Sequence, residues 1–309
     1  MMDIELVNNV LQAAVRTGTP LLLVALGETV AEKSGVLNLG QEGMLLVGAV
    51  VGFITTLTTG SLFLGFMAAL VAGVLMSMLF GVLVLKLNAN QYATGLALTI
   101  FGTGLSAFVG AGYVGQPVTG LEPIAIPWLS DIPVIGNALF NQDLMVYLSF
   151  LATAALFWFF KSTRGGLIVK AVGESPDSAN AIGLPVLPTR YLAVAFGGAM
   201  AGVAGGYLSL AYTPLWAENM SAGRGWIALA LVVFASWRIE RVMLGAYLFG
   251  LASILHLVAQ GLGFSFPPNL LAMLPYVATI LVLVMLSSNP ARNKLYAPVS
   301  LGQPFFKST

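Results

Sequence analysis

The sequence predicts an all-α integral membrane protein, a polytopic helical chain of about nine spans, within a range of roughly eight to ten. Of its 309 residues, 58% are hydrophobic and only 8% are charged, whereas about a quarter of the residues in soluble globular domains are charged. The mean hydropathy is +0.91, and apolar segments of membrane length follow one another along nearly the whole chain. A soluble domain is therefore not expected.

Hydropathy puts the expected spans roughly at residues 10–27, 39–58, 61–85, 89–109, 143–160, 189–210, 224–237, 242–260 and 270–288. The first apolar run has no basic segment ahead of it, so we expect an uncleaved first span and no signal peptide. A re-entrant or broken helix around residues 17–43 is an alternative that changes how the first span is counted.

Lysine and arginine orient these spans. Loops of one parity, together with the C-terminal tail, hold the basic residues Lys33, Lys86, Lys161, Arg164, Lys170, Arg190, Arg238, Arg241, Arg292, Lys294 and Lys307. The opposite loops hold Glu122, Asp131 and Glu218 and no basic residue, if Arg224 is counted as a span boundary. Because basic residues accumulate on the cytoplasmic side, we expect the N-terminus outside and the C-terminus in the cytoplasm.

An outer segment of about residues 110–142 interrupts the spans. Its prolines include Pro117, Pro123, Pro127 and Pro133, and proline removes a backbone donor and restricts the chain. We expect this segment to be an outer cap. The alternative is a structured surface loop that makes no contact with substrate.

A cytoplasmic loop of about residues 161–189 predicts a short helix outside the membrane. Ser175 suits the N-cap, Pro176 the first helical position, Asp177 the positive helix end and Gly183 a left-handed exit. We expect the helix to expose Ala179, Ile182 and Leu184. So short a helix is marginal in water and needs a partner surface; the alternative is an ordinary loop on the membrane surface.

Polar side chains near the second span are candidates for a solute pathway, since each is costly in lipid unless it faces protein or water. If that span begins near Leu37, Asn38 and Glu42 lie one turn apart on one face. We expect Asn38 and Gln41 to border the pathway. We expect Glu28, Glu32, Lys33 and Glu42 to brace a bent helix by ionic and hydrogen-bond contacts, with a purely structural clamp as the alternative.

Three more polar residues are pathway candidates. Asn90 and Gln91 open the fourth span, where amides bind a neutral solute without trapping it by charge; solvation of the helix end is the alternative. His256 lies in the eighth span, and an interhelical contact is its alternative role. Arg16 lies in the first span, and we expect it to reach the nearer surface with Asp3 or Glu5 as partner.

Several kinds of chemistry are excluded. No G-x-x-x-x-G-K-[ST] phosphate loop occurs, so the chain does not hydrolyse ATP alone. No H-E-x-x-H and no Ser-His-Asp spacing points to an enzyme, and with no cysteine and one histidine no metal site is expected. The formal net charge of +1 gives no general attraction to nucleic acid.

Four stretches carry a family resemblance. They are GETVAEKSGVLNLGQEGMLLVGA at residues 27–49, NANQYATGLAL at 88–98, the loop at 164–184, and APVSLGQPFF at 297–306. They resemble the permease subunits of ABC importers in the simple-sugar and nucleoside branch, most of all the shorter nucleoside-type permease. Gln303 and Phe305 depart from the usual ending.

The resemblance implies a single transmembrane permease domain over residues 1–309, with a cytoplasmic tail of about 289–309. It also implies that the loop helix docks on an ATPase through Gly173, Glu174, Ser175, Pro176, Asp177, Ala179, Ala181, Ile182 and Gly183. The implied partners are a second, longer permease as a heterodimer, an ABC ATPase that binds the ATP and magnesium, and an extracytoplasmic solute-binding lipoprotein. No cofactor is implied for this chain.

The implied function is import of nucleosides, or related simple sugars, across the bacterial plasma membrane by alternating access. A self-contained ion-coupled secondary transporter or channel is the main alternative, motivated by Glu42, Arg16 and His256. A membrane anchor for a partner complex is a third.

Overall fold

The structure, a computed structural model, describes residues 2–130, 132, 135–261, 273, 277 and 297–306. The α-helices are α1 (Met2–Lys33), α2 (Gln41–Thr59), α3 (Leu62–Gly81), α4 (Gln91–Gly110), α5 (Ile135–Phe140), α6 (Leu144–Ser162), α7 (Arg164–Glu174), α8 (Pro176–Ala181), α9 (Val186–Tyr207), α10 (Arg224–Phe234) and α11 (Ile239–Gly261). The π-helical turns η1 (Val82–Lys86) and η3 (Leu208–Tyr212) extend α3 and α9, and the short helix η2 (Ala111–Tyr113) follows α4. Two short strands, β1 (Ile124–Ala125) and β2 (Asn141–Gln142), pair antiparallel.

Six helices in the described part of the chain are long and apolar enough to cross a membrane. They are Glu5–Lys33, Gln41–Thr59, Leu62–Lys86, Gln91–Tyr113, Leu144–Ser162 and Val186–Tyr212, and they match the first six predicted spans. The span predicted at 224–237 is instead α10, which has 11 residues and covers only about half of a bilayer core at ~1.5 Å per residue. α11 occupies the eighth predicted span, whereas 270–288 falls almost wholly outside the described residues.

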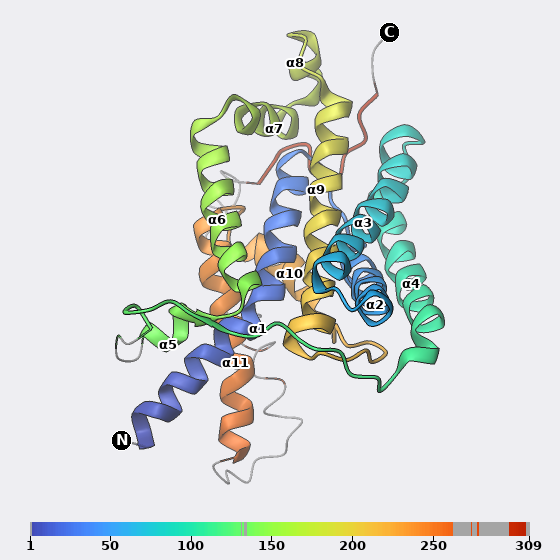
Figure 1. Cartoon of the computed structure of the whole chain (residues 1–309). Coiled ribbons are helices and arrows are strands. Elements are labelled where there is room, and N and C mark those ends of the chain that lie inside the picture. The colour runs from blue at the N-terminus through green and yellow to red at the C-terminus, as the bar shows by residue number, and fades with distance from the viewer. Residues whose placement is uncertain are drawn as a thin grey trace.

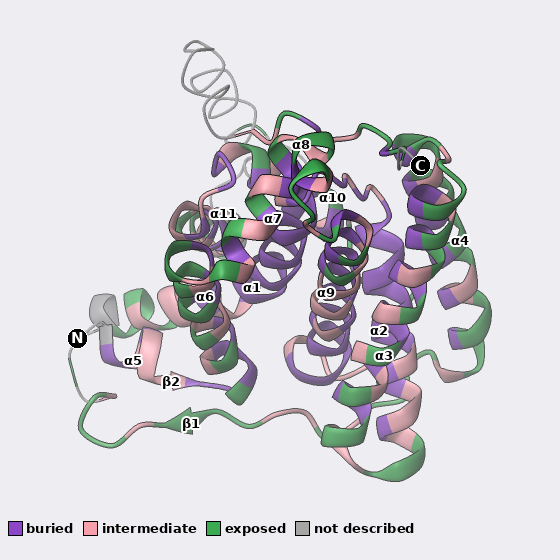
Figure 2. Ribbon diagram, turned by 90° about the horizontal axis from the view of Figure 1, so that it is seen from above, coloured by how far each residue is buried: buried purple, intermediate pink, exposed green. Residues whose placement is uncertain are grey.

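Helices α1, α2 and α9 form the buried centre of the bundle. In Figure 2 they are mostly buried, whereas α4 and α6 carry exposed faces on the outside. Close approach depends on glycine: a Cβ at Gly202 would overlap the carbonyl oxygen of Ala69 on α3, and one at Gly205 would overlap that of Leu45 on α2. Small residues permit this packing where the hydrophobic effect does not drive helices together.

The two ends of the bundle differ (Figure 1). Helices α7 and α8 lie at one end with residues 297–306, which we call the tail segment, while the N-terminus and α5 lie at the other. The segment at 110–142 also runs along that second end, where β1 and β2 pair Ile124 with Gln142. Its described residues contain no spanning helix, as its prolines predict.

Replacement of Gly205 by alanine tests the α2–α9 contact. The added methyl group overlaps backbone of α2, so we expect the free energy of unfolding to fall by about 1–3 kcal/mol. Gly104→Ala on α4 is the control, because a Cβ there meets nothing within 4 Å. Thermal unfolding of the two purified variants should differ, and equal melting temperatures would contradict the packing.

Candidate functional site

A break in the helical backbone separates α1 from α2 at residues 34–40, which we call the break. Its backbone groups pair with atoms from other parts of the chain. Three of its carbonyl oxygens accept hydrogen bonds: Ser34 O from Arg190 Nε at 3.1 Å, Gly35 O from Gly302 N at 3.2 Å and Leu39 O from Thr99 Oγ1 at 2.8 Å. Two of its N–H groups donate to side chains: Leu37 N to Gln91 Oε1 at 2.8 Å, and Asn38 N to Glu28 Oε1 at 2.9 Å. Irregular backbone is tolerated at membrane depth only where protein satisfies it, and these contacts do so.

The break runs inward along α4. Gln91 is the first residue of α4, and Thr99 follows about 12 Å further along the helix axis at ~1.5 Å per residue. Because the break contacts both residues, α2 begins inside the bundle. The first ten residues of α2 are all buried.

Glu28 on α1 holds the start of α2. Its Oε2 accepts from the side-chain amide of Gln41, and its Oε1 accepts from Asn38 N at 2.9 Å. The Asn38 side chain turns back to accept from Gly40 N at 2.9 Å. Asn38 therefore precedes α2, and the prediction that it shares a helical face with Glu42 is wrong because α2 starts later than expected.

Glu42 holds the start of α10. Its Oε1 accepts from Ser221 Oγ at 2.5 Å and from Gly223 N at 2.9 Å, and its Oε2 accepts from Gly225 N at 2.5 Å. Gly223 is the N-cap of α10 and has no side chain to cap it. A carboxylate from α2 thus replaces the local cap, where the helix dipole favours negative charge.

Glu32 completes the set of buried carboxylates, one turn after Glu28 on α1. Its Oε2 accepts from Trp237 Nε1 at 2.5 Å, in the connection between α10 and α11. Glu28, Glu32 and Glu42 are 0%, 1% and 7% exposed, so each contact lies inside protein. The predicted ionic brace is wrong for Lys33, which forms no ion pair in the described part of the chain and lies over the ring of Phe160.

The remaining pathway candidates are separated from one another. Asn90 caps α4, accepting from Ala93 N at 3.0 Å, and its side chain is exposed. Gln91 is buried and joins α4 to the break. His256 belongs to α11, but its side chain lies outside the described residues.

Helix α8 has the local signals that the sequence predicts. Ser175 Oγ accepts from Ser178 N at 3.3 Å, Pro176 is the first helical residue, and Gly183 has a φ of +83°. Ile182 is 76% exposed, as expected. The expected exposure of Ala179 is wrong, since it is 2% exposed and belongs to a small apolar cluster with Val172, Val186 and Phe305.

Arg190 joins the break to the tail segment, a role that the sequence analysis missed. The side chain is fully buried. Its Nε donates to Ser34 O at 3.1 Å, Nη2 to Ser300 Oγ at 3.1 Å, and Nη1 to Gln303 O at 3.3 Å. Ser300 Oγ then donates to Gly173 O of α7 at 2.7 Å. The tail segment therefore connects α7 to the break.

Arg16 has partners other than the predicted Asp3 or Glu5. Its Nη2 donates to Ala211 O at 3.0 Å, and its Nε lies 3.7 Å from Asp143 Oδ2. Asp143 also caps α6 and accepts from Tyr207 Oη at 3.0 Å. Asp143 is buried at the start of α6, where its carboxylate attracts the guanidinium of Arg16.

Replacement of Glu42 by alanine tests the joint between α2 and α10. The change leaves Ser221 Oγ and two backbone N–H groups without their acceptor, so we expect the free energy of unfolding to fall by about 2–5 kcal/mol. Glu218→Ala is the control, because Glu218 is exposed and lies in the same connection; we expect it to stay within ~0.5 kcal/mol of wild type. Similar thermal unfolding of the two variants would refute the joint.

The chain is similar to known permeases over nearly its full length. It is 40% identical to the "putative glucose ABC transporter permease protein" TsgC13 of Haloferax volcanii, over 96% of each chain. It is 32% identical to the "guanosine ABC transporter permease protein" NupQ of Bacillus subtilis, over 99% of each chain, and 32% identical to the "nucleoside ABC transporter permease protein" NupC of Lactococcus lactis, over 94% of each.

A family model described as "branched-chain amino acid transport system / permease component" matches residues 10–285. Such permeases are multi-pass inner-membrane proteins and transport components rather than enzymes, and they work with an ATPase and a substrate-binding protein. The match covers most of the chain, and the six spanning helices agree with it. The chain therefore belongs to this permease family and is the membrane-spanning subunit of an ABC importer.

Proposed function

We propose that this permease moves a neutral, hydroxyl-rich solute, a nucleoside or a simple sugar, by alternating access. The observation that carries the proposal is the near full-length similarity to permeases named for glucose, guanosine and nucleosides. The charges inside the bundle are compatible with a neutral solute, because Glu28 and Glu42 are engaged by donors of the chain itself. The amide oxygen of Gln41, which has no partner among the described residues, is then available to a hydroxyl group.

For the pathway we propose the residues Asn38, Gln41, Glu42, Asn90, Gln91 and His256. Support comes from Gln41, whose Oε1 is buried without a hydrogen-bond partner in the described part of the chain. Such an acceptor is costly to leave unpaired, and a hydroxyl-bearing solute or a water would pair with it when the break opens. Glu42 takes a positioning role here, since it holds α10 beside Gln41.

We further propose that α8 and its flanks dock on the ATPase through Gly173, Glu174, Ser175, Pro176, Asp177, Ala179, Ala181, Ile182 and Gly183. The helix lies beyond the ends of the spans (Figure 1), and the side chain of Ile182, its C-cap residue, is exposed on the surface. Its other face is anchored through Ala179 and Phe305. Movement of a docked α8 would reach the break through the tail segment and Arg190.

For the orientation of the chain in the membrane, we propose the one that the distribution of lysine and arginine predicts. The N-terminus lies outside and the C-terminus lies in the cytoplasm. About nine spans, within a range of eight to ten and with α10 of half length, form one permease domain over residues 1–309. A longer permease paralogue completes a heterodimer. The end with α7 and α8 carries the lysines and arginines of the loops, including Lys86, Lys161 and Lys170, which supports a cytoplasmic position for it. A solute-binding lipoprotein meets the opposite end, along the segment at 110–142.

The ion-coupled carrier is not favoured. Family membership points to an importer driven by an ATPase. Two of the three residues that motivated the carrier, Glu42 and Arg16, are engaged by donors or acceptors within the chain. A membrane anchor without transport has no observation in its favour.

Uptake by vesicles that contain the assembled importer tests the solute class. We expect ATP-dependent uptake of labelled guanosine or glucose, with competition by close analogues of the solute that enters. Leucine should not compete, because it is a zwitterion with a carboxylate and an ammonium group, whereas the proposed pathway binds a neutral solute. Uptake of leucine with neither guanosine nor glucose entering would contradict the proposal.

A charge at Ile182 tests the docking helix. Ile182→Asp places an uncompensated carboxylate in the proposed interface, which costs about 3–5 kcal/mol, so we expect solute-stimulated ATP hydrolysis to be lost while the chain still inserts. Gly183→Pro should act alike, because proline cannot adopt the φ of +83°. Leu87→Asp is the matched control, since Leu87 is 64% exposed at the same end. Normal coupling in Ile182→Asp would refute the docking role.

A further inference from the structure

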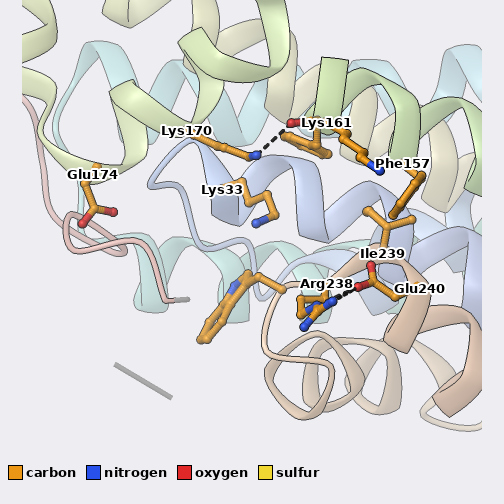
Figure 3. Close-up of a pocket in the computed structure, with 10 residues that line it drawn as sticks. Lys33, Phe157, Lys161, Lys170, Glu174, Arg238, Ile239 and Glu240 are labelled. Atoms are coloured by element: carbon orange, nitrogen blue, oxygen red, sulfur yellow. Dashed lines mark hydrogen bonds and ion pairs between the residues drawn. The ribbon is translucent and has the colours of Figure 1, made fainter. Parts of the chain in front are cut away.

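A basic pocket lies beneath α7, at the end of the bundle that carries α8, apart from the break and from the exposed face of α8. It has a volume of about 400 Å³ and is bordered by α1, α6, α7 and the start of α11. Lys33, Lys161, Lys170 and Arg238 line it, together with the acids Glu174 and Glu240. We call it the lysine pocket; Figure 3 shows its side chains.

The three lysines of the pocket form no ion pair among the described residues, and Lys33 is attracted only at longer range by Glu240. Lys170 Nζ donates to the backbone oxygen of Phe160 at 2.8 Å. Lys33 Nζ lies 5.5 Å from the ring centroid of Phe160. Lys161 Nζ lies 5.4 Å from the ring centroid of Phe157. In the part of the chain that the structure describes, none of these amines forms an ion pair.

The two acids of the pocket offset only part of the charge of its four basic residues. Glu240 is paired with Arg238, whose Nε donates to its Oε1 at 2.6 Å. Figure 3 shows Glu174 at the left of the view, apart from the amines of Lys33 and Lys170 near its centre. Like charges held close together in a partly desolvated pocket repel one another, and a bound anion offsets that repulsion.

The lysine pocket lies at the ends of two of the candidate membrane spans. Lys33 is the last residue of the spanning helix Glu5–Lys33, and Lys161 lies next to the end of Leu144–Ser162. Lysine at a span end sits at the membrane surface, and basic pockets between spans bind phosphate-bearing headgroups. Phe157 and Ile239 add apolar surface to the same pocket.

We propose that the lysine pocket binds a phosphate group, carried by an anionic phospholipid or present as a free phosphate. Lysine binds phosphate as a point charge, and three such charges reach one cavity from α1, α6 and α7. A bound phosphate would hold α7 against α1, where a Cβ at Gly173 would already overlap Lys33 O. The inference concerns a site of its own and does not depend on the solute or on docking by α8.

Protection of the lysines from an amine-reactive reagent tests the site and its source. The full-length permease is placed in nanodiscs of phosphatidylcholine, with or without inorganic phosphate, and in nanodiscs of phosphatidylcholine and phosphatidylglycerol in equal parts. Mass spectrometry then gives the labelling rate of each lysine. Compared with phosphatidylcholine alone, we expect Lys33, Lys161 and Lys170 to react about five-fold more slowly in the arm that supplies the bound phosphate, either phosphatidylglycerol or inorganic phosphate. Lys86, which is exposed at the same end, should keep its rate.

The arms distinguish the two sources. Protection by phosphatidylglycerol alone assigns the phosphate to lipid, and protection by inorganic phosphate assigns a soluble ligand. Equal rates in all arms overturn the proposal. Equal protection of Lys86 overturns it too, because the effect is then that of the charged surface and not of the pocket.

A pair of variants gives a second readout. The double variant Lys161→Gln/Lys170→Gln should bind phosphatidylglycerol, or inorganic phosphate, more weakly than the wild type does. We expect the affinity to fall about five-fold for each lysine removed. Lys86→Gln should retain it as wild type does. Native mass spectrometry of the purified proteins measures the retained ligand, and unchanged retention in the double variant overturns the proposal.

Discussion

Buried carboxylates that bind interrupted helices are the constraint on which the rest of the structure depends. A membrane interior offers no water to satisfy free backbone groups, yet α2 and α10 both begin within the bundle. Glu28 accepts from the break ahead of α2, and Glu42 accepts from the first residues of α10. Without these acceptors, each helix start would leave buried donors unpaired at a cost of about 1–3 kcal/mol per group.

The same break is held from the α8 end of the molecule. Arg190 bridges Ser34 to the tail segment, and Ser300 in that segment binds Gly173 of α7. Helix α7, the tail segment and the break therefore share one set of hydrogen bonds, and α8 packs on the same segment through Ala179 and Phe305. In an importer driven by a separate ATPase, such a connection is what a displacement of α8 needs to reach α2, and a fully buried arginine with three acceptors supplies a firm link.

Local features were predictable from the sequence, and distant pairings were not. The six long spans follow from apolar length, and the start and end of α8 follow from Ser175, Pro176 and Gly183. The partners of Glu42 lie about 180 positions away along the chain, and no local pattern indicates them. The burial of Ala179 depends on Phe305 in the tail segment, which is distant in the sequence. The short length of α10 could not be predicted, because its residues belong to a longer continuous apolar run.

Hydrogen exchange at the start of α10 tests the central claim most directly, because it reads the backbone donors that Glu42 binds. Mass spectrometry of a peptide covering residues 219–226 compares the wild-type chain with Glu42→Ala in the same membrane mimetic. We expect slow exchange at Gly223 and Gly225 in the wild type and faster exchange in the variant. Fast exchange of these amides in the wild type, or no change on removal of the carboxylate, would contradict the account.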